Sequence, residues 1–315
     1  MSKVTKVILI TAGALILVGL IVSAIGIVIL RNSVKKNDKK VVYEHKEEVI
    51  TEDFTDLNLS EISETIEIKP SEDGQVRIDY YDAEKYIHKI EVKNNTLELY
   101  VKTYEDNAPW WERFSFHFDI EGLVTAGEEH PTTIYLPEDS YGSLTISTVS
   151  GEVIVPENYS FEGMSVSTTS GDVVAECIAT GTVSFDTTSG NIAAANINAT
   201  SLDASSTSGE LSFTDTKVSG GVNINSVSGT VTLKDVKSDD LEVNTVSGEI
   251  YLTALDTETA SLTTTSGDIS GTIAGDHEYE VDTTSGDIDL PSSIKGESLI
   301  EIDTVSGDVS LDAAA

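Results

Sequence analysis

Cysteine is nearly absent from this chain: among 315 residues there is one, Cys177. A single thiol excludes an intrachain disulfide and a cysteine-based metal site. Its surroundings are apolar and strand-like, so we expect a small buried side chain and not a reactive thiol. Histidine is also scarce, and the histidines show no spacing typical of metal ligands. They are His45, His88, His117, His130 and His277.

Basic residues are few, whereas acidic residues are many. The sequence has 54 Asp and Glu against 19 Lys and Arg, for a formal net charge of −35. Residues 146–315 contain four lysines and no arginine, whereas binding a nucleic-acid backbone requires basic side chains at the phosphates. Nucleic acid is therefore excluded as a partner, and a cationic partner is favoured.

Long apolar runs are missing except for one, over residues 7–30, which holds 24 residues without a charge. A helix of that length spans about 36 Å, enough for a hydrocarbon core of about 30 Å. A secretory signal has a shorter apolar region of about 7–15 residues. We therefore predict a single transmembrane helix over 7–30, after a short flank at 1–6 and before a basic tether at 31–44.

The charges around this helix leave its orientation open. Two lysines precede it and five basic residues follow it within residues 31–40, so the positive-inside rule would keep the C-terminal part in the cytoplasm. A cysteine-poor β array rich in Ser and Thr is, however, typical of bacterial surface modules, and large domains translocate despite flanking charge. We expect an extracytoplasmic domain anchored at the cell membrane, with a cytoplasm-facing domain as the alternative.

One phrase recurs nine times between residues 148 and 308: Thr or Ser, then Thr or Val, then Ser-Gly, usually followed by an acid and an aliphatic residue. The spacing is 19 to 21 residues, which marks a repeat array whose units are stable because they stack on their neighbours. We interpret the glycines as structural corners, where the chain turns sharply or takes a positive φ. They are Gly151, Gly171, Gly190, Gly209, Gly229, Gly248, Gly267, Gly286 and Gly307.

Apolar residues alternate strictly on both sides of each Ser-Gly: six and four residues before the serine, and three after it. This pattern predicts two strands per unit with one face turned inward. A parallel β-solenoid of about nine coils of 19–20 residues fits, and we expect a right-handed coil. An antiparallel meander with Ser-Gly hairpin turns also fits the alternation, but it leaves a wide one-faced sheet and uses a poorer turn pair. We predict the all-β solenoid over residues 143–315.

Residues 45–142 precede the array and hold most of the aromatic residues. Within them Phe114, Phe116 and Phe118 alternate with polar residues after Trp110 and Trp111. We predict that this strand-rich part caps the open end of the solenoid and seals its core. The alternative is an aromatic platform for glycans or lipid headgroups.

The residue after each corner glycine is acidic in most copies, and stacking would align these residues as an outward column. Carboxylates about 5 Å apart repel, so a calcium ion between rungs is conceivable, although calcium takes six to eight oxygens and known calcium β-rolls have a denser Gly-Asp loop. A solvated acidic face that discourages lateral aggregation is the simpler interpretation, and we predict no cofactor. The candidate column is Glu152, Asp172, Glu210, Glu249, Asp268, Asp287 and Asp308, with Asn191 and Thr230 completing it.

Catalysis is not indicated. Parallel β-helices include enzymes that act on polysaccharides, which need a base or two carboxylates placed across a cleft. Here the acids recur as stacks, the array has a single histidine, and its lysines fall in the predicted loops opposite the corners. We therefore predict no catalytic residues. The lysines are Lys217, Lys234, Lys237 and Lys295.

At these residues the chain resembles a bacterial family. The T-[TV]-S-G-[DE]-[VI] units, after a segment that ends in TTIYLPEDSYGSLTI, are similar to domain-of-unknown-function family 4097, labelled putative adhesin. The helix ahead of them is similar to membrane-anchored members linked to cell-envelope stress systems. The resemblance implies a β-repeat fold at the cell surface and brings no catalytic residues.

These observations predict a membrane-anchored, extracytoplasmic β-repeat protein with a non-enzymatic binding, adhesion or structural role at the envelope. Its partner would be an envelope polymer, another membrane protein or a cationic partner. Two alternatives remain: a cytoplasm-facing scaffold or regulatory module of an envelope-stress system, and a β-helix enzyme acting on envelope glycans.

Overall fold

The structure, a computed structural model, describes residues 42–83, 86–103, 130–292 and 298–314. In these ranges the chain forms 25 β-strands and no helix. No helix that could span a membrane occurs there, and the transmembrane helix predicted over 7–30 lies outside the described residues.

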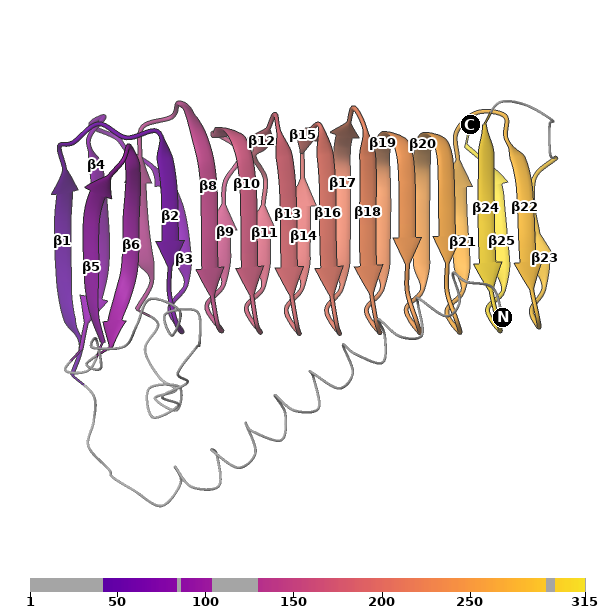
Figure 1. Ribbon diagram of the computed structural model, residues 1–315, viewed down its shortest axis with the longest axis horizontal. Coiled ribbons are helices and arrows are strands. Elements are labelled where there is room, and N and C mark those ends of the chain that lie inside the picture. The colour runs from indigo at the N-terminus through magenta and orange to yellow at the C-terminus, as the bar shows by residue number, and fades with distance from the viewer. Residues whose placement is uncertain (1–41, 84–85, 104–129, 293–297, 315) are drawn as a thin grey trace, which may run out of the picture.

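The strands wind into a solenoid with a front sheet and a rear sheet. Figure 1 shows the strands of each sheet side by side along the long axis, with the rear sheet behind the front one. In spatial order the front sheet contains β5 (Tyr86–Lys93), β6 (Thr96–Thr103), β2 (Asp56–Ser60), β8 (Ser140–Thr148), β10 (Ser160–Thr168), β13 (Thr182–Thr187), β16 (Ser201–Ser206), β18 (Gly221–Ser226), the second halves of β19 (Val231–Asn244) and β20 (Ile250–Thr263), β24 (Leu299–Thr304) and β22 (Glu278–Thr283).

The rear sheet faces it across the core. It contains β1 (Glu44–Ile50), β4 (Val76–Asp82), β7 (Thr132–Leu136), β3 (Ile66–Pro70), β9 (Val153–Val155), β11 (Val173–Ala175), β14 (Ile192–Ala195), β17 (Leu211–Val218), the first halves of β19 and β20, β21 (Ile269–Ile273), β25 (Val309–Ala313) and β23 (Ile288–Asp289). Every strand pairing in the repeat array is parallel, and the register is continuous except for one shift between β20 and β21, so the solenoid prediction is confirmed and the antiparallel meander is wrong. From the first Ser-Gly corner to the ninth the chain completes eight turns, where about nine coils were expected.

The core follows the predicted alternation. The inward residue six positions before the motif serine is buried in eight of the nine repeats, as in Leu144 and Leu202, and the residues four before and three after it behave in the same way. The exceptions, Tyr279, Val281 and Ile288, all lie in the coil of β22 and β23, which stands at the end of the stack. Burial of these apolar columns between two sheets is the main stabilising contribution.

The side opposite the corners is a short third side, where loops were expected. The strands β12 (Ile178–Ala179) and β15 (Asn198–Ala199) lie there, and β19 and β20 run across it without interruption. Lys217 belongs to β17, and Lys234 and Lys237 belong to β19, whereas Lys295 lies outside the described residues. The turn into this side has a positive φ at Asn196, Asp215, Asp235 and Ala254, a conformation that Asn and Asp tolerate better than most residues.

The coils do not follow each other in sequence order at either end. At the C-terminal end β24 and β25 insert between the coil of β20 and β21 and the coil of β22 and β23. At the N-terminal end β2 and β3 insert between the strands β6 and β7 and the strands β8 and β9. Because the repeats present equivalent surfaces to their neighbours, the period alone does not determine which coil stacks on which.

The corner glycines are required by close packing at the turn and, with one exception, do not have the positive φ that was the other expectation from the sequence. Only Gly286, in the end coil, has a φ between +20° and +160°. A Cβ on Gly209 would lie 1.7 Å from the carbonyl oxygen of Gly190, and the same contact recurs from rung to rung. Any side chain at these corners would therefore separate adjacent coils.

We predict that Gly209→Ala destabilises the protein by about 3 kcal/mol, because its Cβ meets backbone that cannot move without opening a rung. Gly221→Ala is the matched control: Gly221 lies in β18, and a Cβ there meets nothing within 4 Å. It should leave stability unchanged or raise it by about 0.5 kcal/mol. Urea unfolding of both variants checks this, and equal midpoints would contradict it.

Candidate functional site

Each corner is closed by the Thr or Ser that begins the motif, two residues before the motif serine. Its hydroxyl oxygen accepts the N–H of the corner glycine in eight of the nine repeats, as between Gly171 N and Thr168 Oγ1 at 2.8 Å. These side chains are buried, so the bond satisfies both groups. The eight acceptors are Thr148, Thr168, Thr187, Ser206, Ser226, Thr245, Thr264 and Thr304.

The sequence analysis did not identify this hydroxyl. The available signal was the two-residue alternation of the strand. The first Thr or Ser stands two residues before the motif serine, and the inward apolar residues stand four and six before it, so all three point to the same side. The motif serine instead bonds to the neighbouring coil: Ser170 N lies 2.8 Å and Ser170 Oγ 3.3 Å from the carbonyl oxygen of Val149. Six further motif serines bond to the adjacent rung in the same way, so the phrase serves the architecture.

The predicted acidic column is present at the corner edge of the solenoid. In stacking order it consists of Glu152, Asp172, Asn191, Glu210, Thr230, Glu249, Asp268, Asp308 and Asp287. All are exposed except Thr230, which is half-buried. The last two are exchanged relative to the sequence because the β24–β25 coil inserts before the β22–β23 coil.

The short members of this column bind the backbone of the next rung. Asp172 Oδ1 accepts the N–H of Asn191 at 2.7 Å, and Asn191 Oδ1 accepts that of Glu210 at 2.9 Å. Asp268 and Asp308 repeat the arrangement near the C-terminal end. One oxygen of each is therefore engaged within the chain. Within the ranges that the structure describes, no group of three or more His, Cys, Asp or Glu side chains could hold a metal ion.

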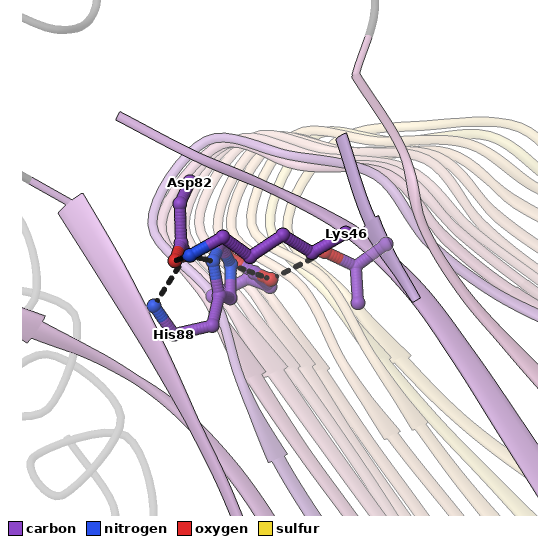
Figure 2. A network of polar contacts seen from close by, with 5 residues as sticks. Lys46, Asp82 and His88 are labelled. Atoms are coloured by element: carbon purple, nitrogen blue, oxygen red, sulfur yellow. Dashed lines mark hydrogen bonds and ion pairs between the residues drawn. The ribbon is translucent and has the colours of Figure 1, made fainter. Parts of the chain in front are cut away.

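A second polar cluster, missed by the sequence analysis, is buried at the N-terminal end of the solenoid (Figure 2). The ring nitrogens of His88 each lie 2.9 Å from a carboxylate oxygen: Nε2 from Glu61 Oε1, and Nδ1 from Asp82 Oδ1. Asp82 also binds Lys46 Nζ at 2.7 Å, and Thr132 Oγ1 donates to Glu61 at 2.6 Å. The cluster joins residues of four strands, β1, β4, β5 and β7, to Glu61, which directly follows β2.

The signal for this cluster was a degenerate repeat. Ser60 pairs with Ser147 and Ile66 with Val153, so Glu61 takes the place that Thr148 holds in the next coil. The sequence there reads Glu-Ile-Ser-Glu-Thr-Ile, without the glycine that marks the other corners. The missing glycine hid the relationship, and the histidine that faces Glu61 lies 27 residues away in the chain.

The charges in this cluster favour a protonated histidine. Burial lowers the pKa of His88, but the hydrogen bonds and charges of Glu61 and Asp82 outweigh it, and the pKa is raised above its ordinary value of 6.5. Burial also acts to raise the pKa of Asp82, yet the bonds from His88 and Lys46 leave that pKa below its ordinary value. The cluster therefore holds His88 between two acidic side chains, with Lys46 on the far side of Asp82, and the His88 side chain is only 2% exposed.

Cys177 and the aromatic run complete the set of predicted positions. Cys177 is fully buried beside Met164, with the sulfur atoms 3.7 Å apart, and burial raises the pKa of its thiol to about 12. The expectation of a small buried side chain is confirmed. The run from Trp110 to Phe118 lies outside the described residues, so its capping role stays a prediction.

We predict that Thr187→Val destabilises the protein by about 2 kcal/mol, because the isosteric change leaves the buried N–H of Gly190 without its acceptor. Thr232→Val is the matched control, since Thr232 points outward from β19 and is half-buried. Thermal unfolding of the two variants checks the difference. A Thr187→Val protein as stable as the control would contradict the role of the hydroxyl.

We also predict a pH-dependent effect of His88→Gln. Because the pKa of His88 is higher in the folded protein, its protonation stabilises the fold fully below about pH 6.5, the ordinary histidine pKa. This stabilisation is lost as the pH rises through the higher pKa of the folded state. The variant should therefore be less stable than the parent by about 3 kcal/mol at about pH 6, and the gap should narrow by about pH 9. Urea unfolding at both pH values checks this, with the exposed His45→Gln as the control. A gap independent of pH would exclude a charged His88.

One solved structure shares this fold, and two others align with lower scores. A crystal structure described as a putative lipid binding protein from Parabacteroides distasonis ATCC 8503 aligns with a TM-score of 0.51 at 18% identity, covering 86% of this chain and 96% of that one. A putative adhesin from Bacteroides fragilis NCTC 9343 aligns with a TM-score of 0.41 at 14% identity, over 87% of this chain and 98% of that one. A putative cell adhesion protein from Clostridium sporogenes ATCC 15579 has a TM-score of 0.22 at 12% identity, over 86% of this chain and 100% of that one.

Matches at the level of sequence families are more specific than these structural similarities, which show the fold alone. No curated protein matches the chain. The family model Toastrack DUF4097, in contrast, matches residues 54–222 and 202–315, which together span most of the sequence. This chain therefore belongs to the Toastrack DUF4097 family.

Proposed function

We propose that this protein is a membrane-anchored, extracytoplasmic module that binds a repeating polymer of the cell envelope through its front sheet, without a catalytic step. The single observation that carries the proposal is the pair of outward polar columns on that sheet. One column runs Thr145, Ser165, Ser184, Asp203, Asn223, Glu242, Ser261, Glu301 and Glu280; the other runs Ser147, Ser167, Asp186, Ser205, Asn225, Asn244, Thr263, Asp303 and Asp282.

These columns offer hydroxyl, amide and carboxylate groups at the spacing of adjacent strands, about 4.8 Å. Their side chains are held by bonds along the stack: Asn244 Nδ2 lies 3.3 Å from Asn225 Oδ1, and Ser205 donates to Asp186. Such a surface is rigid before a ligand arrives, which lowers the entropic cost of binding. A polymer with regularly spaced hydroxyl or amino groups can contact several rungs at once and gain affinity from multivalency.

The presence of a polar group at every rung supports binding more than turnover. A hydrolase places one acid and one base at a single point of its substrate. The front columns instead repeat comparable groups along the stack, and each bond they make within the chain is between neighbouring rungs or neighbouring columns. The same proposal places the helix over 7–30 in the membrane and residues 31–44 as the tether.

We predict that a charge change on the front sheet weakens binding of the full-length protein to isolated cell-wall sacculi. Asp203→Arg with Asn225→Arg puts one arginine into each column and should lower retention on the sacculi in a sedimentation assay about tenfold. The control, Ser212→Arg with Thr232→Arg, adds the same side chains to the rear sheet and should leave retention unchanged. Equal loss in both would contradict a front-sheet site. A single substitution of a surface acid that abolished cleavage of the polymer would establish an enzyme instead.

Orientation is tested separately by protease treatment of intact cells. Extracytoplasmic placement predicts that the acidic domain is degraded while the cells remain closed. A domain that survives intact, and is degraded only after lysis, would support the cytoplasm-facing scaffold, which the five basic residues after the helix would favour.

A further inference from the structure

The C-terminal end of the solenoid has two strand edges without a neighbour in the described part of the chain. Strand β22 pairs with β24 on one side only, and β23 pairs with β25 on one side only. At the right of Figure 1 these two strands form the outermost rung. The backbone N–H and C=O groups along such an edge form a template for a further strand.

The apolar ladder of the core also ends uncovered at this rung. Along one inward column Ile269 is 0% exposed, Val309 is 1% exposed, and Ile288 in the end coil is 47% exposed. On the front side Tyr279 and Val281 are half-buried, whereas Ile300 and Ile302 in the adjacent coil are fully buried. The end coil thus presents the same inward columns as every interior coil, without the layer that would cover them.

The corner of this coil is incomplete as well. Thr283 occupies the position of the eight corner hydroxyls, yet its buried Oγ1 has no hydrogen-bond partner in the described structure. Gly286 has a φ of 154°, unlike the other corner glycines. The end rung therefore departs from the closed geometry that the interior rungs share.

Among the described residues, the carboxylates around the β22 edge have no Lys or Arg beside them, and Lys295 lies outside the described ranges. No Lys or Arg occurs in residues 238–292 or 298–314. Glu280 and Asp282 point outward from β22, and Glu301 and Asp303 lie beside them on β24. Burial raises the pKa of Asp303, and the carboxylates of Asp282 and Glu280 raise it further. These carboxylates repel one another, and a cationic neighbour would relieve the repulsion.

The opposite end of the solenoid is protected in another way. There the outer strands β1 and β5 run antiparallel to β4 and β6, and both carry charges of either sign, such as Lys46 and Glu48 on β1 and Lys89 and Glu91 on β5. Mixed charge on an edge strand discourages pairing with another chain. Lys46 and His88 also join the buried network below these strands. Only the C-terminal edge combines a parallel rung, an uncovered apolar column and charges of one sign.

From this combination we infer that β22 receives an extended basic segment of a partner protein as an added β-strand. The backbone of that segment would pair with residues 278–283, its alternate apolar side chains would cover Tyr279 and Val281, and its Lys or Arg side chains would meet Glu280 and Asp282. Strand addition is a general mode of peptide recognition in which main-chain bonds supply affinity and alternate side chains supply specificity. A second copy of this chain fits less well, because its own β22 edge would bring like charges together. The inference concerns the end of the solenoid and does not depend on the front-sheet site.

The test uses the full-length protein in detergent micelles and a fluorescein-labelled peptide of alternating Lys and Val, measured by fluorescence anisotropy. Glu280→Lys with Asp282→Lys should weaken binding about tenfold, because favourable cross-strand charge pairs become repulsive. The matched control, Glu162→Lys with Glu176→Lys, makes the same change in net charge at two exposed acids on interior rungs, outside the front-sheet columns, and should bind like the parent. The same peptide with alternate valines N-methylated keeps its charge, cannot form the ladder, and should bind about tenfold more weakly.

Hydrogen exchange provides the second measurement. The parent should gain amide protection over residues 278–283 when the peptide binds, and that gain should be absent with the N-methylated peptide. Equal binding of the two peptides, or equal weakening by the edge and interior charge changes, would mean nonspecific attraction to an acidic protein and would overturn the inference. A concentration-dependent dimer that the edge substitutions abolish, without peptide binding, would assign the edge to a second copy and would also overturn it.

Discussion

The close approach of one corner to the next is the constraint on which the rest of this structure depends. Eight corner glycines stack so near the carbonyl oxygen of a glycine in the adjacent rung that no Cβ fits between them, and Gly151 stacks in the same way on Glu64. That approach lets the motif serine bond to the neighbouring coil and brings short carboxylates within reach of the next backbone amide. The threonine hydroxyl inside the corner then satisfies the glycine N–H, which no neighbouring strand reaches. The six-residue phrase, which recurs nine times, is thus one packing solution used at every corner.

Much of the fold was predictable because a two-residue alternation of apolar and polar side chains is a strong signal of β-strands. A strict alternation on both sides of Ser-Gly defines inward columns, and the structure buries those columns in every coil with neighbours on both sides. The acidic column was predictable for the same reason. The order of the coils was not, because Val309 meets Ile269 and Ile288 equally well in register, and a period cannot distinguish neighbours that look alike. The buried network was hidden because its glycine is missing and its members come from distant strands.

The two ends show opposite solutions to the edge problem of any solenoid. At the N-terminal end the chain abandons the parallel pattern, adds antiparallel strands, and buries a histidine between two carboxylates. Such a network is stable only when all its members are present, so it favours one arrangement of five chain segments over others. At the C-terminal end the described chain keeps the parallel pattern to its last rung. The first solution closes the stack, and the second leaves it able to continue.

This difference bears on where a repeat protein can acquire specificity. Identical rungs present identical groups, so a uniform array distinguishes ligands by spacing and charge but not by a unique contact. Unique contacts arise only where the period is broken. In this chain the breaks are the end rungs and the substitutions within columns, such as Asn191 and Thr230 among the acids at the corner edge. A front surface with a polar group at every rung would suit an extended, repetitive ligand, whereas the β22 edge would suit one strand of defined sequence. On these two proposals, recognition of a polymer and of a single strand would occupy different places along one axis, and each could change without disturbing the core that supports both.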